Sequence, residues 1–381
     1  MIEKKIMFLH ILKDDKFAEP LINIYQAYND ITSEFVFYGR RDKLKYIKGR
    51  DDVEVFESAK EFVERLKDRD YNVVFFHSLQ PQICRFIKSI PSDKIVIWWA
   101  FGYDIYGDLR FGPQSFVNDS FYYPETLKIL KEPRSIQATI KKWCVKLYIE
   151  SILRLYKKDI LGRVDYFQPV IPYEFEQVKN LFKRDVHEYY LPRYDAEYNF
   201  VYSPKSENGN IIIGNSASAI NNHADVWLRI KDYIPKNREV VMPLSYGDMS
   251  YAKAVKEKVR GDHTIRFLDT FLPRDEYLSI VNSCSYAVYG SIRQHAMGNI
   301  YTSLRNGVKV FLLKDSYIYK YLSKSGFVVF AIEDVDERSF FTPLSMEQQK
   351  QNFDCLENER EYRNQKGTLA LDEIRKRINI K

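Results

Sequence analysis

The stretch Asn210-Ile-Ile-Ile-Gly-Asn-Ser-Ala-Ser-Ala-Ile-Asn-Asn-His223 decides the fold of this chain. Three consecutive isoleucines are typical of a strand that is buried on both faces, as in a parallel sheet. The strand is expected to end at Gly214, which tolerates a positive φ and lets the backbone approach a ligand closely. Because ligands bind at the carboxyl ends of strands in open α/β sheets, Asn215 and Ser216 are candidate ligand contacts. The alternative is a strand–turn–helix joint that binds nothing.

A helix is expected to begin just after this loop, with Asn221 or Asn222 as its N-cap. A helix N-terminus has free N–H groups and partial positive charge, so it favours an anion such as a diphosphate. Asn222 and His223 therefore join the candidate binding residues.

Strands and helices alternate on both sides of this stretch. Buried strands are predicted at 72–79 and 94–100 in the first half, and a second series begins at 211. This alternation predicts an α/β protein with two doubly wound parallel sheets. The polar segment Ser203–Asn210 marks the boundary between them. We expect an N-terminal domain over 1–205, a C-terminal domain over 206–345, and a helical tail over 346–381 that could pack back on the first domain.

The composition is that of a globular protein: of 381 residues, 15% are aromatic and 29% are charged. This excludes a disordered chain. No apolar run approaches the roughly 20 residues of a membrane-spanning helix, and the first residues lack the apolar core of a signal peptide. The four cysteines are too scattered to indicate a zinc site or a disulfide framework. We therefore expect a cytoplasmic protein with reduced thiols.

Positive charge is concentrated between Thr126 and Arg163, where ten Lys or Arg accompany three Asp or Glu. Apolar residues at helical spacing predict one long helix over about 133–159, with a wide apolar face opposite a basic face. The helix is either a core helix with a solvated face or a helix that lies on anionic lipid. Nucleic-acid binding is a third interpretation, but no binding motif accompanies the charge. The lipid interpretation singles out Lys141, Lys142, Trp143 and Lys146.

Three loops of the second half follow predicted strands and carry polar or small residues. They are Gly214–Ser216, Pro243–Asp248 and Gly290–Gly298, and at the carboxyl edge of one sheet they would converge on one crevice. Arg293 is suited to pairing with a phosphate, and Gln294 to hydrogen-bonding with one. The spacing matches neither a Walker motif nor a G-x-G-x-x-G fingerprint. The alternative is a surface arginine followed by a helix-packing glycine.

His77 and Asp104 each follow a predicted buried strand of the first half, so both are candidates to face a cleft. A sugar hydroxyl that attacks an activated donor needs a base, and partial burial would raise the pKa of the Asp104 carboxyl toward a useful range. The alternative is a capping role for Asp104 and a hydrogen-bonded core position for His77. No Asp-x-Asp pair follows a strand, so we expect no metal ion in the chemistry. Arg293 and helix dipoles would offset the leaving-group charge instead.

Together these motifs resemble the family 56 glycosyltransferases, the TDP-4-acetamido-4,6-dideoxygalactose (Fuc4NAc):lipid II transferases of enterobacterial common antigen assembly. The resemblance is strongest over 210–334. It rests on Gly214–Ser216 with Asn222 and His223, on Val241–Gly247, on Arg293–Gly298 and, more weakly, on Trp98–Tyr106.

The resemblance implies a GT-B fold, in which two Rossmann-like domains face each other across a cleft. The C-terminal domain would hold a TDP-sugar or related nucleotide-sugar, and the N-terminal domain an undecaprenyl-diphosphate-linked acceptor. It implies a peripheral enzyme on the cytoplasmic face of the bacterial inner membrane, with no cofactor and no nucleic-acid partner. The donor site that it implies, together with the loop residues above, comprises Gly214, Asn215, Ser216, Asn222, His223, Pro243, Ser245, Tyr246, Arg293, Gln294 and Gly298.

The sequence departs from the wider GT-B pattern in one respect. Many such enzymes hold the ribose with a glutamate on the helix after the diphosphate loop, but Gly298–Asn306 contains no acid. The nucleotide base therefore stays open.

The leading interpretation is a transferase that moves a deoxy-amino sugar to a lipid-linked saccharide in surface polysaccharide assembly. An epimerase of the same two-domain architecture would act on the donor alone. A membrane-recruited scaffold would bind no nucleotide.

Overall fold

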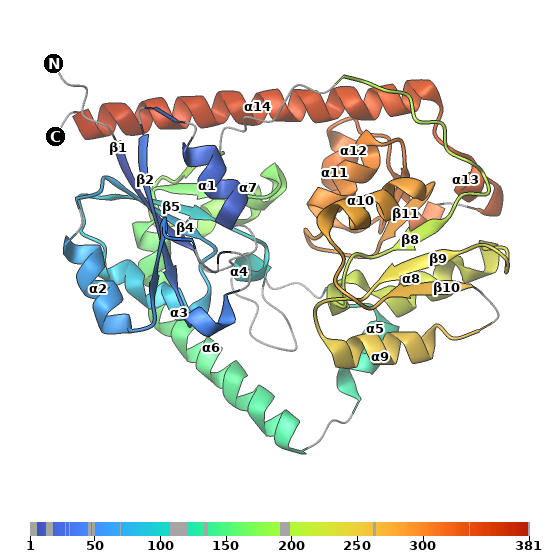
Figure 1. Ribbon diagram of the computed structural model, residues 1–381, viewed down its shortest axis with the longest axis horizontal. Helices are drawn as coiled ribbons and strands as arrows, with labels where there is room; N and C mark the ends of the chain where they lie inside the picture. Colours follow the sequence, from blue (N-terminus) through green and yellow to red (C-terminus); the bar gives the residue numbers. More distant parts are fainter. Residues whose placement is uncertain are drawn as a thin grey trace. The chain divides into compact units, whose positions relative to one another are not determined.

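The computed structural model describes residues 6–12, 18–26, 28–29, 31–44, 47, 50–68, 70–106, 121–132, 136–190, 199–261, 264–334 and 336–379. The chain forms two compact α/β units (Figure 1). Unit 1 contains Met1–Asp119, Ile136–Ala196 and Arg360–Lys381, and unit 2 contains Ser120–Ser135 and Glu197–Glu359.

Unit 1 is built on a seven-stranded parallel sheet with the order β3-β2-β1-β4-β5-β6-β7. The chain moves outward from β1 in one direction and then, from β4, in the other. The switch point of this sheet therefore lies between β1 and β4. The strands are β1 (Ile6–Leu12), β2 (Ile31–Tyr38), β3 (Val53–Phe56), β4 (Val73–His77), β5 (Ile95–Trp99), β6 (Tyr166–Gln168) and β7 (His187–Glu188); the helices are α1 (Ala18–Gln26), α2 (Ala59–Asp68), α3 (Pro81–Cys84), α4 (Tyr103–Tyr106), α6 (Ile136–Arg163) and α7 (Pro172–Val178).

Unit 2 repeats this order with a six-stranded parallel sheet, β10-β9-β8-β11-β12-β13. Its switch point lies between β8, the predicted triple-isoleucine strand, and β11. The strands are β8 (Ile211–Ile213), β9 (Val240–Pro243), β10 (Ile265–Leu268), β11 (Tyr286–Tyr289), β12 (Lys309–Leu312) and β13 (Phe330–Ala331); the helices are α5 (Pro124–Lys131), α8 (His223–Ile230), α9 (Met249–Lys258), α10 (Arg274–Ser283), α11 (Met297–Arg305), α12 (Tyr317–Lys324) and α13 (Glu337–Phe341). Helix α14 (Met346–Asn379) begins in unit 2 and ends in unit 1.

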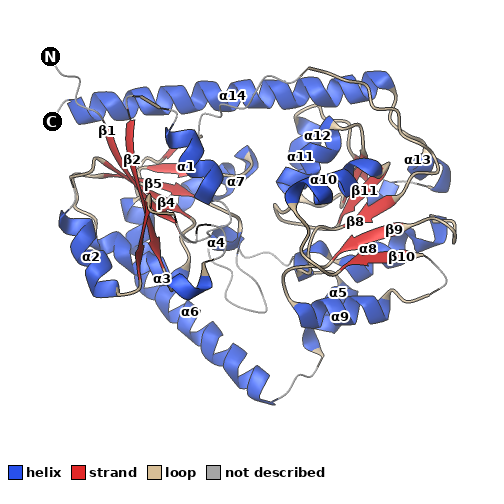
Figure 2. Cartoon of the chain, in the orientation of Figure 1, coloured by secondary structure: helices blue, strands red, loops and turns tan. Residues whose placement is uncertain are grey.

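In each unit the helices surround a central sheet (Figure 2). The central strands β4, β5, β8 and β11 are buried on both faces, which explains their continuous apolar runs. In unit 1, Phe8 and Phe75 of the sheet share one buried cluster with Tyr25 of α1 and with Leu371 and Ile374 of α14. The end of the predicted helical tail therefore belongs to the core of unit 1.

The division into units differs from the predicted domain boundaries. The linker falls at 196–197 rather than 205–206, and α14 is divided between the units at 359–360. The segment that contains α5 belongs to unit 2, although it lies within the predicted first domain. The reason is a set of hydrogen bonds to the Asp225 carboxylate of α8, which accepts from the Glu125 and Thr126 N–H groups at 2.8 Å each and from the Thr126 hydroxyl at 2.7 Å. Such tertiary contacts leave no periodic signal in the sequence.

Helix α6 begins and ends a few residues later than predicted and is mostly exposed over its first half. Its last turns pack against α3 and the 3₁₀ helix Arg85–Ser89, and Ile160 is fully buried. By contrast, Ile140, Trp143 and Leu147 remain exposed. The predicted apolar face is therefore uncovered at these three residues.

Candidate functional site

The loop after β8 is held in a conformation that only glycine permits at its first position. Gly214 has a φ of +71°, and a Cβ there would lie 2.5 Å from Nε2 of His223. Since a side chain would be strained and would also collide with the histidine, the β8 strand can turn sharply only at a glycine. His223 is the first residue of α8, so the turn places an imidazole against the end of β8.

His223 is a neutral, fully buried imidazole with one free nitrogen. Its Nδ1 lies 3.2 Å from the Tyr251 hydroxyl, and burial lowers its pKa to about 3. Its Nε2 has no hydrogen-bond partner among the described residues. The ring is therefore held at Nδ1, whereas Nε2 makes no hydrogen bond with the described residues.

Further buried polar groups lie in the loop after β8 and in the loop after β11. Among the described residues, hydrogen-bond partners are absent for Asn215 Oδ1, Asn221 Oδ1, Ser291 Oγ and His295 Nε2. Each buried polar atom left unpaired costs roughly 1–3 kcal/mol, so native proteins rarely leave several together. Such a cluster at the switch point of a sheet is expected where a polar ligand completes the hydrogen bonds.

The backbone at both switch points is strained. The described non-glycine residues with positive φ are Ser78 (70°), Asn222 (46°) and Ala296 (57°). Ser78 follows β4, Asn222 follows the β8 loop, and Ala296 precedes α11 in the loop after β11. The left-handed conformation costs a non-glycine residue about 1–2 kcal/mol, and such strain concentrates at functional sites.

At the N-terminus of α11, Gly298 is exposed and a Cβ there would meet nothing within 4 Å. The protein itself therefore gives no steric reason for a glycine at this position. Arg293 is 6% exposed and donates from Nη1 to the carbonyl oxygen of its neighbour Gln294 at 2.8 Å, and Gln294 is itself buried.

The expectation that Asn221 or Asn222 caps α8 through its side chain is wrong. Asn222 occupies the N-cap position, but its side chain makes no capping bond. Its Nδ2 donates to the Gly290 carbonyl at 2.7 Å and to the Phe121 carbonyl at 3.1 Å, and its Oδ1 accepts from the Tyr123 N–H at 2.9 Å. Because these bonds occupy both ends of the amide, Asn222 ties the β8 and β11 loops to the α5 segment, a role that differs from the predicted donor contact.

The loop after β9 joins the same site. The Ala217 N–H donates to the Tyr246 carbonyl at 2.7 Å, the Asp248 N–H donates to the Ala217 carbonyl at 2.9 Å, and Asn215 Nδ2 lies 3.2 Å from the Tyr246 hydroxyl. Of the other predicted residues here, Pro243 is a buried end of β9 and Ser245 is partly buried. The three predicted loops of unit 2 are thus connected by direct contacts.

In unit 1, Asp104 is enclosed by donors. It is 4% exposed, and its carboxylate accepts from Trp98 Nε1 at 2.7 Å and from the Leu79 and Phe101 N–H groups at 2.9 Å each. Burial raises its pKa, and these hydrogen bonds partly oppose the rise. The contacts are those of a carboxylate that holds the ends of β4 and β5 together, which differs from its predicted role as a base.

His77, at the end of β4, belongs to a buried chain of polar groups. Its Nε2 lies 3.0 Å from Nδ1 of His10, whose Nε2 lies 3.3 Å from the Ser33 hydroxyl. Burial, and secondarily the charge of His10, lowers the pKa of His77 well below its usual value. Its Nδ1 has no partner in the described part of the chain. His77 is therefore a neutral imidazole, oriented by His10, at the switch point of the unit 1 sheet.

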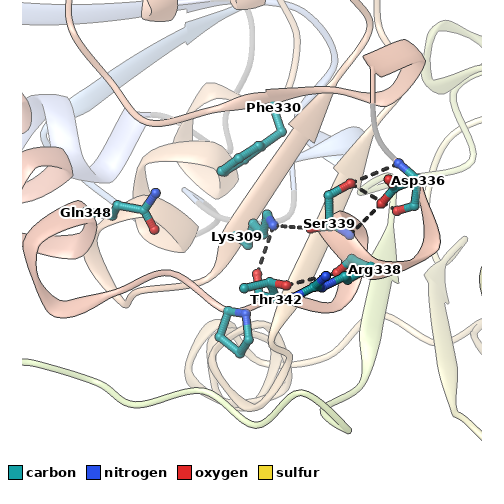
Figure 3. A pocket seen from close by; sticks show the side chains of 8 residues that line it. Lys309, Phe330, Asp336, Arg338, Ser339, Thr342 and Gln348 are labelled. Carbon is teal, nitrogen blue, oxygen red and sulfur yellow. Dashed lines mark hydrogen bonds between the residues drawn. The ribbon is translucent and has the colours of Figure 1, made fainter.

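A separate hollow of about 360 Å³ lies at the opposite, amino edge of the unit 2 sheet, and Lys309, Phe330, Arg338 and Thr342 are among its lining (Figure 3). Lys309 Nζ donates to the carbonyl groups of Ser339 and Thr342 and lies 4.2 Å from the centre of the Phe330 ring. Burial lowers the pKa of this lysine to about 8. Lys309 thus satisfies carbonyl groups at the end of α13, which is a structural role.

Within the described residues, no group of three or more His, Cys, Asp or Glu side chains is arranged to hold a metal ion.

Comparison with known proteins identifies the family of this chain. The profile of the family described as 4-alpha-L-fucosyltransferase, glycosyl transferase group 56, matches residues 154–356, more than half of the chain. This chain belongs to glycosyltransferase group 56. The match includes the whole unit 2 site, from Gly214 to Gly298.

Solved structures show the fold of this glycosyltransferase. The Anabaena protein HepE, in complex with UDP and glucose, is 12% identical over 97% of this chain and 100% of its own, with a TM-score of 0.56. A UDP-forming α,α-trehalose-phosphate synthase from Burkholderia xenovorans is 8% identical over 97% and 100%, with a TM-score of 0.54. The lipopolysaccharide outer core galactosyltransferase WaaB is 9% identical over 93% and 100%, with a TM-score of 0.50. The protein is a GT-B glycosyltransferase with two Rossmann-like units.

Several residues of the site were not predicted from the sequence. Ser291 and His295 lie in a loop that was predicted to bind, yet no motif marks them individually, and Asn221 was considered only as a helix cap. His10 lies in the middle of β1 and bears no sequence signal of its own. Its link to His77 depends on the pairing of β1 with β4, which aligns His10 with Phe75.

Proposed function

We propose that this glycosyltransferase binds a nucleotide-sugar at the carboxyl edge of the unit 2 sheet. The observation that carries the proposal is the set of unpartnered polar atoms in the loops after β8 and β11, which include His223 Nε2 and Ser291 Oγ. A diphosphate offers acceptors to N–H and O–H groups at this position, and the N-terminus of α11 and Arg293 supply positive potential. The sugar hydroxyls offer both donors and acceptors to the remaining groups.

For the transferred sugar we propose a Fuc4NAc-like deoxy-amino sugar carried on TDP, and for the acceptor an undecaprenyl-diphosphate-linked saccharide. Two features support this choice: the family's description as a fucosyltransferase and the likeness of the Gly214–Ser216 and Arg293–Gly298 motifs to the Fuc4NAc transferases. Arg293 and the α11 dipole would stabilise the departing diphosphate without a metal ion.

For the general base we propose His77 rather than Asp104, which has three donors around its carboxylate. If His10 donates from Nε2 to Ser33, its Nδ1 accepts from the His77 Nε2–H. This tautomer leaves a lone pair on Nδ1 of His77, which is what a base needs in order to accept the acceptor's hydroxyl proton.

Helix α6 is the proposed site of membrane association. Ile140 (58% exposed), Trp143 (65%) and Leu155 (63%) present large apolar side chains on a helix within the most basic segment of the chain. Exposed apolar groups combined with positive charge fit the headgroup region of an anionic bilayer. No helix in the described residues is long and apolar enough to cross a membrane.

Titration calorimetry of a Gly298→Leu variant tests the donor site. A leucine there meets no protein atom within 4 Å of its Cβ position, so folding should be preserved, but the side chain would occupy the space of the diphosphate. We expect the affinity of the variant for UDP- and TDP-sugars to fall at least tenfold. The matched control is Gly162→Leu on α6, where the same substitution also meets nothing.

Undiminished binding to Gly298→Leu would contradict the proposed donor site.

Incubation with the donor alone also separates a transferase from an epimerase, because only an epimerase converts the sugar without an acceptor.

A further inference from the structure

Two large aromatic side chains are exposed at the carboxyl edge of the unit 2 sheet. Tyr246, in the loop after β9, is 40% exposed, and Phe271, in the loop after β10, is 56% exposed. Their ring centres are 6.5 Å apart and their planes meet at 67°. The two exposed rings thus lie next to each other at an angle, and we call this pair the corner.

Tyr246 is fixed in place before any ligand binds. The backbone of its loop forms a β-bridge between Ala217 and Gly247, and a Cβ on Gly247, whose φ is +116°, would lie 2.7 Å from the Ala217 carbonyl oxygen. In addition, the Tyr246 hydroxyl lies 3.2 Å from Asn215 Nδ2. The ring therefore loses little conformational entropy when it is covered by a ligand.

The corner is continuous with the proposed donor site. Asn215, which contacts Tyr246, is 7% exposed and has an unpartnered Oδ1 within the described part of the chain. On the other side, burial and the nearby phenols of Tyr289 and Tyr246 raise the pKa of Tyr277. The Tyr277 hydroxyl accepts from Asn299 Nδ2 at 2.9 Å, next to Gly298 at the start of α11. Aromatic groups thus lead from the α11 N-terminus to the corner.

We propose that the corner formed by Tyr246 and Phe271 binds the base of the donor nucleotide, with one face of the base stacked on Phe271 and Asn215 Oδ1 accepting an N–H from its edge. This inference rests on the proposed function, because it assigns a subsite to the same donor. A planar, weakly hydrated ring is the part of a nucleotide-sugar that matches exposed aromatic side chains. Since every common base carries an N–H donor on its edge, this contact would orient the base without selecting one base over another.

Calorimetry with TDP, UDP and inorganic pyrophosphate tests the assignment. Pyrophosphate has the charges of the donor but no base. We expect Phe271→Ala to weaken TDP and UDP binding about tenfold or more, the loss typical of one stacked base, and to leave pyrophosphate binding unchanged. Phe271→Tyr should restore nucleotide affinity because it restores the ring.

The control is Met249→Ala, because Met249 is 52% exposed at the start of α9, on the same edge of the sheet, but has no ring. Equal nucleotide affinity of Phe271→Ala and the wild type would overturn the base subsite and leave the donor site standing. Parallel loss of nucleotide and pyrophosphate affinity would also overturn it, because the residue would then act through the fold. If the wild type bound none of the three ligands, the proposed function itself would fall, and the subsite with it.

Discussion

At the residue scale, the unit 2 site depends on small steric and polar details rather than on charged motifs. Gly214 leaves room for the His223 ring, and His223 presents a neutral nitrogen because burial lowers its pKa to about 3. In the proposed donor site, a neutral imidazole and the amide side chains of Asn215 and Asn221 would act as fixed dipoles that stabilise a bound polar group without reorganisation.

The two candidate bases of unit 1 should respond differently to mutation. Asp104→Asn places an NH₂ group among three donors, so we expect the free energy of unfolding to fall by about 1–3 kcal/mol. His77→Asn should instead lower kcat by roughly 100-fold or more while the affinity for the nucleotide-sugar stays unchanged. Denaturant titration and steady-state kinetics measure the two effects.

The pH dependence of kcat supplies a second check on His77. Its lowered pKa keeps the imidazole neutral from pH 6.5 to 8, so the rate should decline only well below pH 6.5. An acid limb near pH 6.5, or full activity of His77→Asn, would count against the assignment.

Glu174 should make stability depend on pH. Burial raises the pKa of Glu174 to about 7, and hydrogen bonds from the Ile171 and Val170 N–H groups partly oppose the rise. The unfolded chain releases this proton near pH 4.5, so the stabilising effect of the group is complete below pH 4.5 and is lost as pH rises through 7. Relative to Glu174→Gln, the wild type should lose up to about 3 kcal/mol of unfolding free energy between pH 4.5 and 7. Parallel pH profiles of the two proteins in thermal or urea unfolding would refute this.

At the element scale, α6 differs from an ordinary core helix because large apolar side chains on it are exposed. Its final turns are buried against α3, whereas Trp143 and its neighbours stay in solvent. A helix used only for packing would hide such side chains, because burial of a large apolar group contributes about 1.5–3 kcal/mol.

Vesicle flotation tests the role of α6. Reversal of Lys141, Lys142 and Lys146 to glutamate should weaken binding to anionic vesicles roughly a hundredfold, because each basic residue near the surface contributes about 1 kcal/mol. Binding of the wild type should also weaken at high salt. The control reverses three exposed lysines outside α6: Lys60, Lys253 and Lys320. Equal loss in both triple variants would show that only total charge matters and would defeat the assignment of α6.

The elements that sequence reasoning predicted are those whose side-chain pattern is complete in itself. β8, β4 and β5 are short apolar runs buried on both faces. The edge strands β3 and β7 were missed because polar residues interrupt or replace their apolar run, Glu54 in β3 and both His187 and Glu188 in β7. Asn222 was misjudged as a cap because its left-handed backbone and its bonds to Phe121 and Gly290 arise only in the folded unit.

At the scale of the whole molecule, one strand order occurs twice, and each switch point carries a different chemistry. The switch point of unit 1 presents a histidine pair beside strained Ser78. That of unit 2 presents unpartnered dipoles at the start of two helices. The two-unit architecture was predictable from the alternation of strands and helices. The crossing of the α5 segment into unit 2 was not, because it depends on tertiary hydrogen bonds with Asn222 and Asp225.

Hydrogen–deuterium exchange with and without a TDP- or UDP-sugar tests the central claim most directly, because it reports which amides the donor protects. We predict that protection on donor binding concentrates in two segments of unit 2, Gly214–His223 and Ser291–Gly298. The hollow at Lys309 should be unchanged. Protection confined to the Lys309 region, or the absence of any change in the two loops at saturating donor, would contradict the account.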